Sequence, residues 1–150
     1  MIVVGIDPDS TAHGVATYID GELEELEQLN NLQIVNRLAS NYWGKSPVFS
    51  IENVNGVSAA FGARDARANI NVKLKMAQHI GMCKQSQIEL QRALDSFGIH
   101  YKRHKISKLW KKDKEQFQRI TGWSGLSNED TRSAAYFGFL EAHKGGRPPE

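Results

Sequence analysis

The first seven residues, MIVVGID, restrict the fold more than any other segment of the chain. They are mostly β-branched apolar residues, and the run ends in Asp7 and is followed by Pro8. Such a run predicts a strand buried in the centre of a sheet, with a carboxylate at its last position. A charge there is costly unless a cation partner or a bound metal compensates it. Asp7 is therefore the first candidate functional residue.

Further strands follow this one. Asp20-Gly21 is a hairpin signal between two strand-like segments, and the strand VFSIENV again carries an acid, Glu52, near its end. We expect these later strands at residues 13–19, 22–29, 48–54 and 99–101. The loop after Glu52 is rich in small residues, which is typical of a functional loop.

Helical spacing of apolar residues fills the intervals between the strands. We expect helices over 30–43, over 64–97 as one long or two joined helices, over 107–120, and from Ser127 onward. This order indicates an α/β fold, with helices packed on one sheet. We expect one domain over residues 1–143 and a frayed tail over 144–150.

Composition narrows the class of protein. The chain has 150 residues, 40% of them hydrophobic and 24% charged, as in a globular domain. It contains no apolar run long enough for a bilayer span and no signal peptide pattern, so we expect a cytoplasmic protein without membrane contact. Cys83 is the one cysteine, which excludes an intrachain disulfide; we interpret it as buried packing, with no zinc site of familiar spacing around it.

Positive charge is concentrated in one segment. The net charge is only +2, but residues 100–120 hold eight Lys and Arg residues against Asp113 and Glu115. Such a segment suits a polyanion, because Lys and Arg displace the counterions condensed on phosphate backbones. The alternative is a solvated helix face.

Three acids occupy the ends of predicted elements. Asp7 and Glu52 end strands, and Asp130 lies in the first turn of the last helix. If the two strands are neighbours, the three carboxylates converge on one point. Oxygen ligands of this kind select Mg²⁺, with Mn²⁺ able to substitute, and such ions support phosphodiester hydrolysis. Taken singly, the acids also fit a turn former, a salt-bridge partner and a helix-dipole acid.

Four short blocks resemble the RuvC family of Holliday junction resolvases. The string GIDPDSTAHG at 5–14 is similar to the family's opening GIDPG strand, and SIENV at 50–54 is similar to its second acidic strand. LKMAQHIG at 74–81 resembles its first long helix, and KDKEQF at 112–117 its basic helix start. The resemblance implies an RNase H-like mixed sheet of three antiparallel and then two parallel strands. It also implies a homodimer that makes paired, metal-dependent nicks across a four-way DNA junction.

The chain departs from the family pattern at two places. Asp9 stands where the family usually has Gly, which adds a charge beside the expected metal site. The family's last helix carries two acids three residues apart, whereas both Ser127 and Ser133 flank Asp130 at that spacing. Asp130 then matches either the first or the second family acid. Glu129, Asp9 or a water is left to complete the ligand set.

The resemblance also assigns roles to basic and aromatic residues. Lys114 is the expected catalytic lysine, placed to stabilise negative charge on the phosphate. Phe61 resembles in position an aromatic that stacks on junction bases, although a core Phe fits equally well. The predicted DNA contacts are Phe61, Lys105, Lys108, Lys111, Lys112 and Lys114. We interpret Trp43, Trp110 and Trp123 as packing or dimer surface.

Other functions share parts of this pattern. Sugar kinases and actin-like ATPases also place an acidic loop after their first strand. They need two such domains and an adenosine site, however, and a chain of 150 residues is too short for both. A junction-binding protein that has lost one acid, and a nuclease that cuts flaps, forks or RNA, both remain open.

Overall fold

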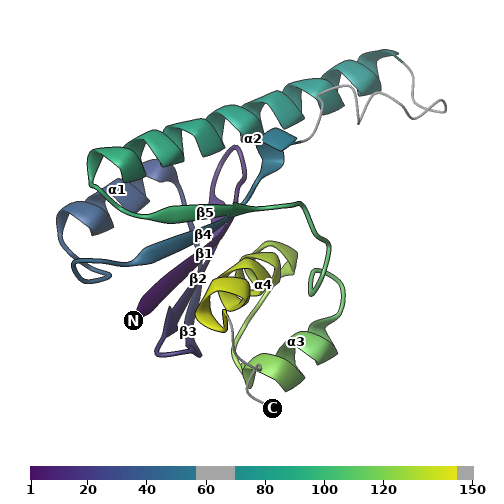
Figure 1. The fold of residues 1–150 in the computed structure, drawn as a ribbon. Helices are drawn as coiled ribbons and strands as arrows, with labels where there is room; N and C mark the ends of the chain where they lie inside the picture. Colours follow the sequence, from purple (N-terminus) through teal and green to yellow (C-terminus); the bar gives the residue numbers. More distant parts are fainter. Residues whose placement is uncertain (57–69, 145–150) are drawn as a thin grey trace.

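The computed structural model describes residues 1–56 and 70–144, which form a mixed sheet with helices against both faces (Figure 1). The strands are β1 Ile2–Asp7, β2 His13–Ile19, β3 Glu22–Leu29, β4 Val48–Glu52 and β5 Tyr101–His104. The helices are α1 Asn31–Ala39, α2 Ile70–Ser96, α3 Lys114–Thr121 and α4 Glu129–Ala142, with a 3-10 turn, η1, at Val54–Gly56. The predicted tail over 144–150 lies almost entirely outside the described residues.

The strand order β3-β2-β1-β4-β5 puts the first strand at the centre of the sheet, as its sequence predicts. β1, β2 and β3 pair antiparallel, whereas β4 runs parallel to β1, and β5 parallel to β4. The expectation of three antiparallel strands followed by two parallel strands is confirmed. In the described part of the chain, no helix has both the length and the apolarity that crossing a bilayer requires.

Two hydrophobic cores explain why β1 is apolar at almost every position. Val4 and Ile6 pack on one face with residues of α1 and α2, such as Ile34 and Leu90. Val3 packs on the other face, in the core that includes residues of α3 and α4. A strand covered on both faces has no solvent-facing side, so apolar residues occur without alternation.

Helix α4 approaches the sheet so closely that glycine is needed where they meet. A Cβ atom on Gly5 would stand 2.6 Å from the backbone nitrogen of Gly138, and one on Gly14 would stand 2.7 Å from the carbonyl carbon of Asp130. Two buried hydroxyls then fasten the helix to the sheet. Tyr18 Oη donates to the Ala135 carbonyl at 2.6 Å, and Ser50 Oγ donates to a further α4 carbonyl at 2.6 Å.

The predicted helix over 107–120 is wrong in its first half, since α3 begins only at Lys114. Asp113 caps the helix by accepting a hydrogen bond from the Gln116 N–H at 2.9 Å. Before the cap, Trp110 adopts a left-handed backbone with φ 68° and inserts its indole into the core against Phe117. The left-handed backbone at Trp110 interrupts the predicted helix at this point.

Other boundaries shift by a few residues. The helix predicted over 30–43 ends at Ala39, and Asn41 follows with φ 57°. β4 ends at Glu52 rather than at residue 54, and β5 begins two residues later than predicted. α2 covers the predicted long helix from Ile70 on, while residues 64–69 lie outside the described chain.

Because α4 packs closely against the sheet, adding a methyl group at Gly14 should destabilise the folded protein. Gly14→Ala should lower the free energy of unfolding by about 1–3 kcal/mol, because a Cβ at this position overlaps the α4 backbone. Gly81→Ala is the matched control, since Gly81 lies within α2 with nothing within 4 Å of an added Cβ. It should stabilise the protein by about 0.5–1 kcal/mol. Urea denaturation measures both, and equal effects of the two substitutions would contradict the packing argument.

Candidate metal centre

Asp7 and Glu52 lie side by side at the ends of two neighbouring parallel strands. Ile6 of β1 pairs with Ile51 of β4, so the acid that follows each of them lies at the same edge of the sheet. Both side chains are buried, with exposed fractions of 5% and 4%. One oxygen of each, Oδ2 of Asp7 and Oε2 of Glu52, has no hydrogen-bond partner. Two adjacent buried carboxylates, each with one oxygen that accepts no hydrogen bond, form a site that needs positive charge nearby.

The pKa values of Asp7 and Glu52 also show that the nearby positive charge is too small to compensate two buried carboxylates. Burial raises the pKa of Asp7, and burial together with the charge of Asp7 raises the pKa of Glu52 to about 8. The ammonium group of Lys111 lowers both pKa values but does not restore them to their usual range. Without a further cation, the pair therefore retains a proton at neutral pH.

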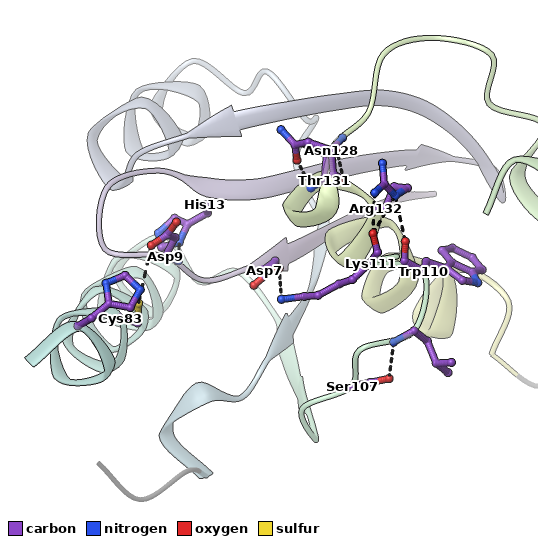
Figure 2. A network of polar contacts seen from close by, with 12 residues as sticks. Asp7, Asp9, His13, Cys83, Ser107, Trp110, Lys111, Asn128, Thr131 and Arg132 are labelled. Atoms are coloured by element: carbon purple, nitrogen blue, oxygen red, sulfur yellow. Dashed lines mark hydrogen bonds and ion pairs between the residues drawn. The ribbon is translucent and has the colours of Figure 1, made fainter. Parts of the chain in front are cut away.

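Lys111 forms an ion pair with one of these acids. Its Nζ lies 3.5 Å from Oδ2 of Asp7, and Figure 2 shows the side chain extended toward that carboxylate. Burial lowers the pKa of the Lys111 ammonium, but the charges of Asp7, Glu52 and Asp130 outweigh burial, and the net shift is upward. Lys111 is therefore charged, and it compensates part of the negative charge of the site.

Arg132 holds the backbone that carries Lys111. Its guanidinium donates from Nε to the Trp110 carbonyl at 3.0 Å and from Nη2 to the Lys111 carbonyl at 2.6 Å (Figure 2). Nη1 donates to Ser127 Oγ at 3.1 Å. Arg132 was not among the residues predicted from the sequence, although a cation among the small residues at 131–135 of the last helix was a signal for it.

Asp130 joins the two strand acids, as its helix position predicts. It is half-buried, and it lines the same cavity as Asp7 and Glu52. Asn128 caps α4 by accepting a hydrogen bond from the Thr131 N–H at 2.9 Å. The helix therefore starts next to Gly14, where the absence of a side chain lets the backbone of its first turn pack against β2.

Ser133 lies on the acid side of α4. Its hydroxyl is fully buried without a hydrogen-bond partner, and its proximity lowers the pKa of Asp7. Ser127, the alternative match to the second family acid, binds Arg132 instead. This placement favours the register in which Ser133 replaces the second acid.

The remaining predicted residues lie farther out. Glu129 is exposed, with its carboxylate 3.9 Å from Lys112 Nζ, and it is not part of the cavity lining. Lys114 is exposed at the first position of α3, whereas Lys108 lines the cavity and Lys105 lines a neighbouring hollow. Phe61 lies outside the described residues.

The acids open into a cavity of about 690 Å³ between the sheet edge and α2. Asp9, His79 and Cys83 line it together with the acids. The interpretation of Cys83 as buried packing is wrong, because the side chain is half-buried at this cavity, with Sγ 3.6 Å from His79 Nε2. Trp43 and Trp110, in contrast, are buried core residues.

The carboxylate set suits a hard divalent cation. Asp7, Glu52 and Asp130 line the cavity with carboxylate groups, two of their oxygens are buried without a hydrogen-bond partner, and the cavity leaves room for water and phosphate. Mg²⁺ prefers such ligands and usually keeps several waters. The residues present therefore fit the metal that the RNase H-like fold implies.

The fold is similar to that of solved RuvC structures. No protein-family model and no curated protein sequence matches the chain. Thermus thermophilus RuvC in complex with a Holliday junction substrate aligns with a TM-score of 0.56 at 15% identity, over 99% of this chain and 100% of that one. Another Thermus thermophilus RuvC structure aligns with a TM-score of 0.47 at 15% identity, over 95% and 93% of the two chains. The chain has a RuvC-like RNase H fold.

The buried acids predict how the stability of the metal-free protein depends on pH. Glu52 ionises near its ordinary pKa of 4.5 when unfolded but at about 8 when folded. The folded state therefore holds the extra proton, and stability present below pH 4.5 is lost as the pH rises through 8. In EDTA, urea denaturation should show a loss on the order of 2–4 kcal/mol between pH 5 and pH 9. Glu52→Gln should remove most of it, and an unchanged pH profile in this variant would refute the assignment.

Proposed function

We propose that the chain is a structure-specific DNA endonuclease that resolves Holliday junctions by paired, Mg²⁺-dependent nicking, with Mn²⁺ able to substitute. The observation that carries the proposal is the pair of buried carboxylates, Asp7 and Glu52, each with one oxygen that has no hydrogen-bond partner, in the lining of a cavity that Asp130 also lines. A phosphodiester is the substrate class that combines a metal site of this kind with a surrounding basic segment.

The three acids would hold the metal. When bound, the metal supplies an activated water and stabilises charge on the phosphate. Ser133 is buried beside Asp7, and its hydroxyl lowers the pKa of that carboxyl, so it would help to keep Asp7 ionised for the metal. Glu129 would have to leave Lys112 to become a ligand.

We assign the lysine nearest the reacting phosphate as Lys111. Its ammonium group already lies 3.5 Å from Asp7, where it would stabilise negative charge on a phosphate bound at the acids. Lys114 is exposed and outside the cavity lining, so its proposed role is contact with the DNA backbone. Lys105, Lys108 and Lys112 would extend that contact, and Phe61 is the proposed stacking residue.

A homodimer would provide the two sites needed for paired nicks. The first half of α2 projects beyond the sheet (Figure 1), and it exposes large apolar side chains. These are Ile70, Leu74, Met76 and Met82. An apolar surface on a projecting helix is typical of a subunit interface. Activity on DNA would place the protein in the cytoplasm of a bacterium or of a phage-infected host.

Ser133 also supports a second candidate, a junction-binding protein without catalysis. It stands where a second helix acid would complete the ligand set, and a hydroxyl is a weaker metal ligand than a carboxylate. Binding of four-way junctions without metal-dependent nicking would identify this function. Cutting of forks or flaps in preference to junctions would indicate a nuclease whose substrate is a different branched DNA.

The nuclease proposal predicts separate effects on cutting and binding. Asp7→Asn, Glu52→Gln and Asp130→Asn should each abolish nicking of a synthetic four-way junction in Mg²⁺. Junction affinity should stay equal or rise, because each change removes negative charge near the phosphates. Asp95→Asn, an exposed acid at the end of α2, is the control and should cut like the wild type. Loss of binding in all three variants would indicate structural acids instead.

Substitution of Lys111 should affect cutting, whereas substitution of Lys114 should affect binding. Lys111→Ala should reduce nicking by about tenfold or more, since it removes the cation next to the acids. Lys114→Ala should leave the rate at saturating junction nearly unchanged and lower the slope of log K against log salt by about one phosphate contact. Single-turnover cleavage and salt titration measure the two effects, and the reverse pattern would restore Lys114 as the catalytic lysine.

A further inference from the structure

We propose that Asp9, His79 and Cys83 form a second metal site, selective for Zn²⁺, in the same cavity as the carboxylate centre. One ligand atom from each residue lies within 4.8 Å of the others. The site uses none of the three acids assigned to Mg²⁺, so it holds whether or not the chain is a nuclease.

The fold brings the three residues together from two elements. His79 and Cys83 are four residues apart on α2, so their side chains lie on one helix face, one turn apart. Asp9 lies in the turn between β1 and β2, and Figure 2 shows it facing the cysteine. The site would therefore tie the long helix to the turn that follows Asp7.

The distances match a tetrahedral zinc site. With Zn–S of about 2.3 Å and Zn–N or Zn–O of about 2.1 Å, tetrahedral angles separate the sulfur from either other ligand by about 3.6 Å. Cys83 Sγ lies 3.6 Å from His79 Nε2 and 3.8 Å from Asp9 Oδ1. Both distances to the sulfur are therefore close to those of a tetrahedral zinc site, and the ligand atoms of Asp9 and His79 lie within 4.8 Å of each other.

Asp9 is already held in position for this role. Its backbone N–H donates to Nδ1 of His13 at 3.0 Å, and Nε2 of that buried histidine lies 2.7 Å from Oδ1 of Asn31. Asp9 Oδ1 also accepts the Ser10 N–H at 2.6 Å. The carboxylate is thus fixed by its neighbours, which lowers the entropic cost of binding an ion.

The donor types separate this site from the carboxylate centre. A thiolate, an imidazole and a carboxylate are the ligand types of zinc, whereas Mg²⁺ binds oxygen. Three protein ligands leave a fourth position for a water from the cavity. The resembled family usually has glycine at the position of Asp9, and glycine offers no side-chain ligand. A zinc site would explain why this chain has an aspartate there.

Co²⁺ substitution tests the site on the full-length wild type. Because Cys83 is the chain's one cysteine, a near-ultraviolet thiolate-to-Co²⁺ charge-transfer band can come from no other residue. We expect this band at one equivalent of Co²⁺, its loss on adding one equivalent of Zn²⁺, and its persistence in excess Mg²⁺. Absence of the band, or its removal by Mg²⁺, would overturn the proposal.

Variants assign the ligands by calorimetric titration with Zn²⁺. Cys83→Ser and His79→Gln should each lower the affinity about 100-fold or more, whereas His100→Gln, an exposed histidine away from the cavity, should not change it. Asp7→Asn should keep the affinity within a few-fold. If Asp7→Asn abolishes Zn²⁺ binding while Cys83→Ser retains it, the ion occupies the carboxylate centre and the second site is refuted. Circular dichroism of each variant confirms that it is folded.

Discussion

The contact between α4 and the sheet is the constraint on which the site depends. Gly5 and Gly14 remove side chains where the helix crosses β1 and β2, and Gly138 does the same from the helix side. Because backbone meets backbone there, the first turn of α4 reaches the ends of the strands. Asp130 is thereby brought to the strand acids, and Arg132 to the segment that carries Lys111.

That packing concentrates negative charge in a place with few donors. Asp7 and Glu52 each keep an unpartnered buried oxygen, and one lysine faces them. Burying like charges side by side disfavours the ionised pair, so the arrangement is unfavourable for the fold alone. In the proposed function, a bound divalent cation would make this arrangement favourable, and stability and function would then be linked through the same carboxylates.

The cavity combines two kinds of donor around one opening. Carboxylate oxygens line its sheet side, while a thiol and an imidazole line its α2 side. The thiol and imidazole suit a softer cation such as Zn²⁺, whereas the carboxylates suit a hard one such as Mg²⁺. The contact of Cys83 Sγ with Asp9 Oδ1 also joins the turn after Asp7 to the long helix α2.

The sequence by itself determined the central strand, the hairpin order, the two strand-end acids and the N-terminus of the last helix, because these depend on local periodicity and capping. It did not determine the turn at Trp110, where burial of one indole overrides a helical pattern. Only the tertiary structure decided that Lys111 faces the acids, that Arg132 supports it, and that Cys83 and His79 meet Asp9. Each of these contacts joins residues from different elements or depends on which way a helix face turns, and such placement is set by packing rather than by neighbours in the chain.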